Sequence, residues 1–155
     1  MNIDITKEQY EKLIVMLGIA NSVVGILGDT VADEGKDYKE MSDEMERVES
    51  YFLEFAKDFG HPEMVEDYEG EIIMVEDFYE EIYSIVDEYD NYTTYDTLSN
   101  VLAKRDFRRD HTEKEIESLL EKNHGYLGVE LYEYEKKYWD EFDEYDYERL
   151  EIVKH

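Results

Sequence analysis

The sequence contains no cysteine and only one proline among its 155 residues. Without thiols the chain cannot form disulfides, thiolate nucleophiles or cysteine-ligated zinc sites, and this composition fits a reducing compartment. A charged start followed by an apolar run and a cleavage site is also missing. We therefore expect a cytoplasmic protein and discount the glycosylation-like triplet at residues 91–93.

Positive charge is scarce. Lys and Arg number 16 against 43 Asp and Glu, a net charge of −27, and residues 58–103 contain neither Lys nor Arg. A surface this negative repels phosphate groups. We therefore expect a basic protein as the partner and no direct binding to nucleic acid or to an anionic membrane. Adaptation to high salt is a rival explanation, but Glu outnumbers Asp, lysines are retained and bulky tyrosines abound.

Apolar residues still make up 42% of the chain and aromatic residues 14%. This content predicts a packed fold, and the length predicts a single domain over residues 1–155. No internal repeat or linker divides the sequence.

Helix signals dominate the N-terminal half. Thr6 and Gln9 have the spacing of a capping box, and the apolar run at residues 13–27 predicts a central buried helix, too short at about 22 Å to cross a bilayer. Gly18, Ser22 and Gly25 form a small-residue stripe on that helix, where another helix can approach closely.

Apolar residues at steps of three and four predict the remaining helices. The stripes are Met41, Met45, Val48, Phe52, Phe55 and Phe59; Val75, Phe78, Ile82, Ile85 and Tyr89; Leu98, Val101 and Leu102; and Leu131, Tyr134, Tyr138, Phe142 and Tyr145. Thr94 is expected to cap the third of these helices, and Thr112 with Glu115 forms a capping box for another. Residues 1–5 and 149–153 alternate like strands. We therefore predict an all-α bundle of five or six helices with a minor two-stranded terminal ribbon.

Carboxylates crowd the polar faces of two predicted helices. The first row consists of Glu76, Asp77, Glu80, Glu81, Asp87 and Glu88, and the second of Asp140, Asp143, Glu144 and Asp146. On a helix such residues lie a few ångströms apart, a charge density comparable with that of DNA. Tyr132, Tyr145 and Tyr147 are expected to be exposed, and tyrosines are frequent anchors in protein interfaces, with Tyr145 or Tyr147 serving the second row. The pattern favours a non-enzymatic decoy that occupies the basic cleft of a nucleic-acid-binding protein; a merely solvated acidic face is the plainer interpretation.

One basic segment interrupts the acidic chain: Lys104, Arg105, Arg108 and Arg109. In so negative a field we expect these side chains to clamp Asp or Glu of neighbouring helices through bidentate arginine bonds. The alternative is an anion or substrate site with Arg105 and Arg109 as ligands.

Motifs for catalysis and metal binding are weak. No EF-hand, phosphate loop or nucleophilic triad is present, so we nominate no catalytic residue, cofactor or metal site. Glu66, Glu69, Asp87 and Asp90 resemble the paired acid motifs with which all-helical pyrophosphohydrolases of the MazG and dUTPase type hold magnesium. With 43 acidic residues, however, about twelve such spacings are expected by chance. That enzyme remains the alternative, and a self-assembling helical module that buries its tyrosine-rich C-terminal face is a third.

The chain ends, IDIT-EQY near residue 3 and KKYWDEFDEYDYERLEI from residue 136, resemble those of small acidic helical proteins of bacteria and their phages. Those proteins have no assigned activity, so the resemblance assigns no functional residue. It implies a bacterial or phage cytoplasm, where small acidic proteins include inhibitors of restriction enzymes and CRISPR effectors. The charge predicts a monomer or a salt-dependent dimer, because like-charged faces repel.

Overall fold

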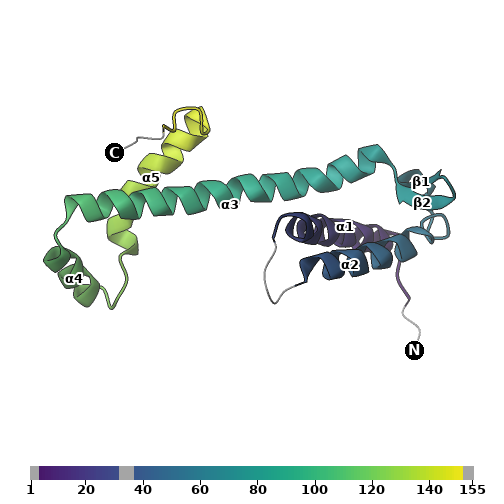
Figure 1. The fold of residues 1–155 in the computed structure, drawn as a ribbon, viewed down its shortest axis with the longest axis horizontal. Coiled ribbons are helices and arrows are strands. Elements are labelled where there is room, and N and C mark those ends of the chain that lie inside the picture. Colours follow the sequence, from purple (N-terminus) through teal and green to yellow (C-terminus); the bar gives the residue numbers. More distant parts are fainter. Residues whose placement is uncertain (1–3, 32–36, 152–155) are drawn as a thin grey trace. The chain divides into compact units, whose positions relative to one another are not determined.

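The computed structural model describes residues 4–31 and 37–151, which form five α-helices and one two-stranded antiparallel sheet (Figure 1). The predicted all-α fold is confirmed. The elements are α1 (Lys7–Thr30), α2 (Tyr38–Leu53), the short 3-10 helix η1 (Pro62–Met64), β1 (Val65–Tyr68), β2 (Glu71–Met74), α3 (Glu76–Asp110), α4 (Glu113–Lys122) and α5 (Gly128–Tyr145). Two compact units divide the chain: unit 1 is residues 1–89 and unit 2 is residues 90–155, so α3 contributes a part to each. The single domain over residues 1–155 stays a prediction.

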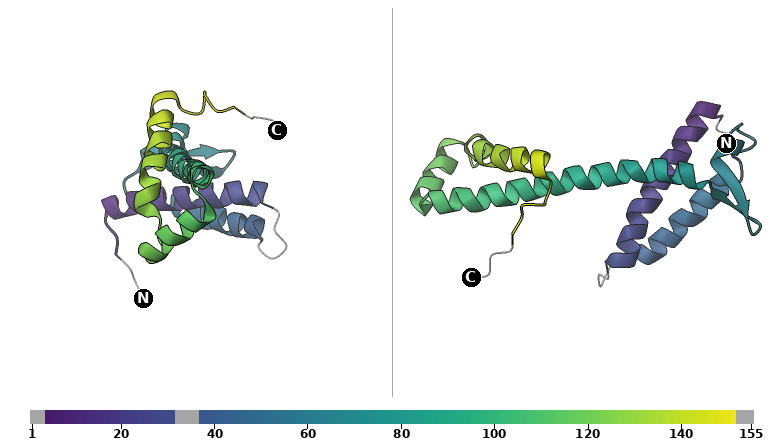
Figure 2. Two further views of the ribbon diagram at one scale, coloured as in Figure 1. Left: turned by 90° about the vertical axis from the view of Figure 1, so that its left-hand side faces the viewer. Right: turned by 90° about the horizontal axis from the view of Figure 1, so that it is seen from above.

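The predicted close approach of another helix to the small-residue stripe of α1 occurs at Gly18, where the approaching helix is α3; α2 comes closest to α1 at Gly28, a residue that the predicted stripe did not include. Helices α1 and α2 lie side by side in both views of Figure 2. A Cβ atom added to Gly28 would lie 3.1 Å from the Tyr38 carbonyl oxygen, and one added to Gly18 would lie 3.0 Å from an Ile82 methyl of α3. The capping box of Thr6 and Gln9 also forms at the start of α1.

The prediction that α1 is a buried central helix is wrong. Only Tyr10, Ile14 and Gly18 are buried, whereas Met16 is 62% exposed and Ile26 is exposed as well. Among the described residues, α1 is the one helix long and apolar enough to cross a membrane by length and composition. In this structure its buried stripe packs in the core of unit 1, where Tyr10 donates a hydrogen bond to the Phe52 carbonyl oxygen at 2.6 Å.

Helix α2 ends at Leu53, earlier than its apolar stripe predicts. Residues 54–60 form turns that carry Phe55 and Phe59 to the core, where the Phe59 ring stacks on Tyr10 at 4.4 Å. Val48 is exposed, and Glu49 lies beside α1 instead, accepting a hydrogen bond from the Asn21 amide at 2.7 Å. Burial raises the pKa of Glu49 despite that bond.

The two-stranded ribbon lies at residues 65–74 and not at the chain ends. Val65 pairs with Met74 and Tyr68 with Glu71, and Glu69 and Gly70 between them both have positive φ, as a tight hairpin turn requires. Residues 4–5 and 149–151 are not in strands, and the rest of the predicted terminal ribbon lies outside the described residues.

Helix α3 runs without a break for 35 residues, where the sequence predicts two helices. Thr94 lies inside it and caps nothing. The buried stripe of its first half is Phe78, Ile82 and Val86, at steps of four, while Ile85 is 45% exposed. The predicted stripe was therefore wrong at Ile85 and at Tyr89, which is 64% exposed.

Unit 2 is held together by aromatic packing between α3 and α5. Tyr95 of α3 stacks on Phe142 of α5 at 5.8 Å, and Phe107 of α3 meets Tyr134 of α5 edge to face at 5.6 Å. Helix α4 begins with the predicted Thr112 capping box, and the turn after it contains Gly125 at a φ of 86°. Leu131 and Phe142 of α5 are buried, which confirms the first and fourth positions of the predicted stripe, whereas Tyr145 at its end is 37% exposed.

The glycine stripe of α1 yields a paired prediction. The nearest atom to a Cβ at Gly25 is the Ser42 hydroxyl at 3.8 Å, which is ordinary contact, whereas a Cβ at Gly28 would press on backbone atoms. Gly25→Ala should therefore raise the free energy of unfolding by up to about 1 kcal/mol through helix propensity, and Gly28→Ala should lower it by about 1–3 kcal/mol. Urea denaturation of both variants measures this. An equal response of the two variants would contradict the close approach at Gly28.

Candidate functional site

The first acidic row lies on the N-terminal part of α3, in unit 1. All six predicted carboxylates, from Glu76 to Glu88, are exposed. Apart from Asp87, none of them forms an ion pair or a side-chain hydrogen bond with another residue that the structure describes. Five of the six carboxylates are therefore solvated negative charges on one rigid helix.

The helix geometry collects these charges on one face. At about 100° per residue the six carboxylates span an arc of roughly 140°, and from residue 76 to residue 88 they extend about 18 Å along the axis. The opposite face is the buried stripe of Phe78, Ile82 and Val86, which fixes the helix in the core of unit 1. Burial on one side thus holds the charges in a defined array on the other.

Two exposed tyrosines border this array and were not predicted as anchors. Tyr79 and Tyr83 are 49% and 44% exposed, and their rings stack at 6.2 Å. By helical position both lie beside Glu76, Glu80 and Asp87. The signal in the sequence was their spacing of four residues within an acidic helix, which places both rings on one side of it.

The second acidic row lies in unit 2 and is engaged internally. Asp140 pairs with Lys136, Glu144 accepts a hydrogen bond from Tyr145 at 2.6 Å, and Asp146 accepts one from Tyr95 at 2.6 Å. That last bond raises the pKa of Tyr95 to about 12. Asp143 is exposed. Three of the four carboxylates of this row therefore have a partner within unit 2, and one of those partners, Lys136, offsets a negative charge.

The predicted tyrosine anchors of the second row differ in exposure. Tyr132 is 57% exposed and Tyr145 is 37% exposed, with the Arg149 guanidinium 4.1 Å above the Tyr145 ring. The expectation that Tyr147 is exposed is wrong, because its ring packs on Tyr95 at 5.0 Å and on Phe142 at 5.6 Å. Asp146, with a φ of 54°, ends α5 and turns the chain so that Tyr147 points back to the core.

The basic segment surrounds one carboxylate of its own helix and not an acid of a neighbouring helix. Arg105 donates from Nε to one Asp106 oxygen at 2.9 Å, and its Nη2 lies 2.8 Å from that oxygen and donates to the Tyr138 hydroxyl of α5 at 2.9 Å. Arg109 lies 3.6 Å from the same Asp106 oxygen. From α5, Tyr138 donates to the other Asp106 oxygen and Lys137 Nζ lies 3.7 Å from it. The predicted bidentate clamp on an acid of a neighbouring helix was wrong, since the contacts of this cluster with α5 run through the Tyr138 hydroxyl, which Arg105 and Asp106 both bind, and through Lys137.

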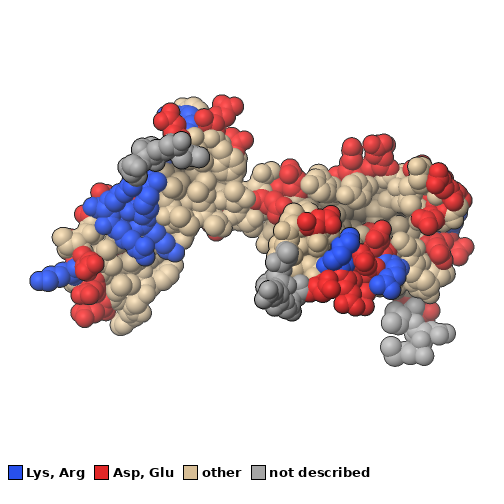
Figure 3. Space-filling view, in the orientation of Figure 1, with Lys and Arg blue, Asp and Glu red and all other residues tan. Residues whose placement is uncertain are grey.

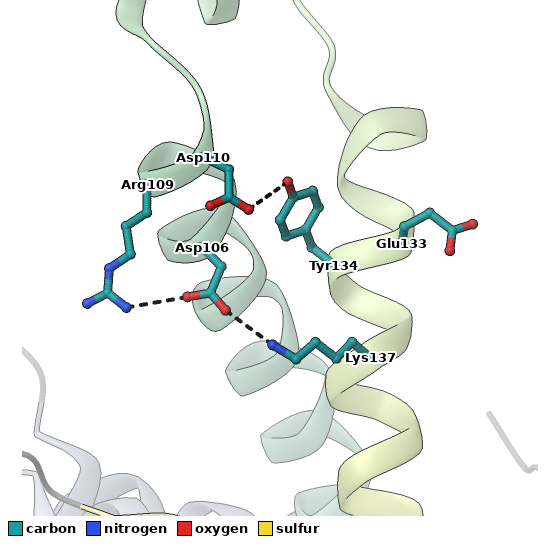
Figure 4. A pocket seen from close by; sticks show the side chains of 6 residues that line it. All are labelled: Asp106, Arg109, Asp110, Glu133, Tyr134 and Lys137. Atoms are coloured by element: carbon teal, nitrogen blue, oxygen red, sulfur yellow. Dashed lines mark hydrogen bonds and ion pairs between the residues drawn. The ribbon is translucent and has the colours of Figure 1, made fainter.

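Asp106 lines an open cavity of about 600 Å³ between α3 and α5 (Figure 4). Arg109 and Lys137 point to Asp106, and Tyr134 donates to Asp110 at 3.0 Å, while the Glu133 carboxylate points away. Burial alone would raise the pKa of Asp106, but the hydrogen bonds from Tyr138 and Arg105 hold that pKa below its usual value. These cations are already partnered by Asp106, which disfavours the alternative of an anion site built on Arg105 and Arg109.

The layout required for the pyrophosphohydrolase alternative is absent. Glu66 lies in strand β1 and Glu69 in the hairpin turn, so the first acid pair is not on a helix; Asp87 and Asp90 are on α3. Within residues 4–31 and 37–151, no three Asp, Glu or His side chains form a group able to hold a metal ion.

Charge is unevenly divided between the units. Unit 1 has 25 carboxylates against 6 Lys and Arg, and unit 2 has 18 against 10. On the face in Figure 3, Lys and Arg gather on unit 2, while acidic side chains dominate unit 1. Unit 1 is therefore the stronger attractant for a basic partner.

No family model, curated protein or solved structure matches the chain. A functional conclusion therefore depends on the surfaces of the molecule itself.

The Asp106 cluster leads to a stability prediction. Asp106→Asn removes the charge that Arg105, Arg109 and Lys137 surround, so it should lower the free energy of unfolding by about 2 kcal/mol at pH 7. Because the native pKa of Asp106 is depressed, this stabilisation is present above the unfolded pKa of about 3.9 and is lost as the pH falls below it. The gap between wild type and variant should therefore close in acid.

The matched control is Asp96→Asn, an exposed carboxylate on the same helix. It should change stability by less than about 0.5 kcal/mol. Denaturant titrations of both variants at pH 7 and in acid measure the difference. A gap for Asp106→Asn that persists unchanged in acid would contradict the charged role of Asp106.

Proposed function

We propose that this protein is a non-enzymatic acidic interaction protein that binds a basic protein surface through the acidic row of α3. The observation that supports this most directly is the set of six exposed carboxylates from Glu76 to Glu88, inside a 46-residue stretch without Lys or Arg. A merely solvated surface needs no such segregation, since charges of both signs are usually interspersed.

The partner that fits this array best is a protein whose cleft is built for nucleic acid. Six charges over about 18 Å give one charge per roughly 3 Å, close to the 3.4 Å spacing of phosphates along one DNA strand. Along the axis the charges come in three pairs, at residues 76/77, 80/81 and 87/88, so the helix matches the mean charge density of a DNA strand, which is what attracts a basic groove. The protein then acts as a DNA mimic that blocks the cleft.

Tyr79 and Tyr83 supply the apolar part of the proposed interface. Long-range charge mainly accelerates association and selects the partner, while buried aromatic side chains provide much of the lasting affinity. Both tyrosines border the row and are about half exposed. The C-terminal aromatic face supports self-assembly less well, because Tyr95, Phe142 and Tyr147 pack against one another within unit 2.

The proposed setting is the cytoplasm of a bacterium, where the protein is either the bacterium's own or that of an infecting phage. Proteins with nucleic-acid clefts are abundant there. The proposed state is a monomer or a salt-dependent dimer. Both proposals rest on the charge and on the resemblance of the chain ends to small acidic bacterial and phage proteins.

The proposal predicts that neutralising four charges of the row weakens partner binding by about a hundredfold. This follows because each exposed ion pair with the partner contributes up to about 1 kcal/mol to the binding free energy. The variant is Glu76→Gln, Asp77→Asn, Glu80→Gln and Glu81→Gln. The immobilised protein captures partners from a bacterial lysate, with elution in steps of rising salt and competition by duplex DNA, and the Kd is then measured for the captured protein. DNA-binding proteins that DNA displaces are the expected catch.

The control neutralises four other exposed carboxylates: Glu44→Gln, Glu46→Gln, Glu113→Gln and Glu117→Gln. It has the same net charge as the row variant but leaves the row on α3 intact. It should therefore retain most of the affinity. Equal loss in both variants would mean that net charge alone attracts the partner, and a partner indifferent to DNA would contradict the mimic.

A further inference from the structure

Unit 2 contains a second hollow, separate from the Asp106 cluster, with an apolar interior and a cationic rim. Its volume is about 400 Å³, and residues of α3, α4, α5 and the loop between α4 and α5 line it. The interior is formed by Phe107, Ile116, Leu120, Leu127 and Leu131. This size falls in the range of small-molecule sites, which are mostly apolar with a few placed polar groups.

Helix α4 leaves its apolar side incompletely covered over this hollow. Ile116, Leu119 and Leu120 are only half-buried, and no residue of α4 is fully buried. An amphipathic helix normally buries such a stripe, so the hollow beneath it is apolar surface that a ligand would remove from water. Phe107 and Leu131 on the opposite side are buried and give the hollow a fixed floor.

The rim has two cations without an internal partner. Lys104 and Arg108 lie one turn apart on α3, line the hollow, and form no ion pair with another described residue. Lys104 and Arg108 differ from the other unpaired cations in that they border an apolar hollow, where they can meet the anionic group of a ligand. Glu135 is the one carboxylate among the lining residues, and its Oε1 atom already accepts a hydrogen bond from the Asn100 amide at 2.6 Å.

We propose that this hollow binds an anionic amphiphile, with its hydrocarbon chain between α4 and the Phe107 floor and its carboxylate at Lys104 and Arg108. A single-chain fatty acid has this chemistry. Tyr126 borders the entrance, where its ring lies over Gly128: a Cβ at Gly128 would come within 2.2 Å of that ring. This site lies outside the acidic row and is independent of the proposed decoy function.

The decisive measurement compares head groups of opposite charge on one chain. Net charge alone makes this protein prefer a cationic amphiphile, so dodecyltrimethylammonium should bind better than dodecanoate if no specific site exists. The proposed site predicts the reverse preference, measured by calorimetric titration below micelle-forming concentrations. A preference for the cation, or no saturable binding of dodecanoate, would overturn the proposal.

Chain length tests the hollow itself. Across octanoate, decanoate, dodecanoate and tetradecanoate, each added CH₂ should tighten binding by up to about fourfold until the hollow is full. Ile116→Phe should shorten the chain at which the gain stops. Affinity that rises without limit in both proteins would indicate nonspecific adsorption and would overturn the proposal.

The cations are tested by a matched pair of double variants. Lys104→Gln with Arg108→Gln should weaken dodecanoate binding by about tenfold, since two exposed ion pairs contribute up to about that much. Lys114→Gln with Lys122→Gln removes the same charge from α4 at exposed residues outside the lining and should leave the Kd unchanged. Equal weakening by both pairs would overturn the assignment of Lys104 and Arg108.

Discussion

The shortage of positive charge governs how this chain folds. With 43 carboxylates and 16 Lys and Arg, most acids cannot be paired, and burying an unpaired charge costs several kcal/mol. The helices therefore turn most of their acids to water, and α3 buries only a narrow stripe around Ile82 and Val86, with Phe78 half-buried against the core. Glu49 is the instructive exception: it lies against α1 on an amide hydrogen bond, and its raised pKa registers the cost. Thin stripes limit the core, so close helix contact at Gly28 and large aromatic rings in unit 2 compensate for them.

The few cations are concentrated where unit 2 needs them. Arg105, Arg109 and Lys137 converge on Asp106, which also binds Tyr138, so one carboxylate ties α3 to α5. This consumes cations that would otherwise neutralise the acidic faces. Lys104 and Arg108, on the same helix, remain outside the cluster and border a different hollow. One basic segment therefore has two separate environments, an internal ion cluster and an open rim.

Local signals in the sequence predicted much of the fold. The capping boxes at Thr6 and Thr112 are determined by residues within one turn, and both form. The small-residue stripe of α1 was confirmed at Gly18, whereas the close approach at Gly28 was not predicted. The failures needed information from farther away. The hairpin at residues 65–74 was missed because Glu69-Gly70 is a weaker turn signal than Asn-Gly. The helix break at Thr94 was wrong because threonine caps a helix only where the preceding helix has ended, and α3 continues through this residue. The predicted core stripe of α3 contained Ile85, but Val86 is the buried residue. Helical periodicity makes the two positions nearly equivalent, and only the packing of α3 against the rest of unit 1 decides which is buried.

The exposed rows of acids were predictable, but their different use was not. Both rows look alike in composition, but the second has partners: Lys136 one turn earlier on the same helix, the adjacent Tyr145, and Tyr95, which only the tertiary structure brings to Asp146. The row on α3 has no cation nearby in sequence, and its helix is fixed by burial on the opposite face. Like charges held at close spacing repel one another in the free protein, so a basic groove that interleaves cations relieves repulsion as well as adding attraction. Because the helix is already ordered, little conformational entropy is lost on binding. A preorganised, self-repelling array is thus better suited to engage a nucleic-acid cleft than a row whose charges are already satisfied.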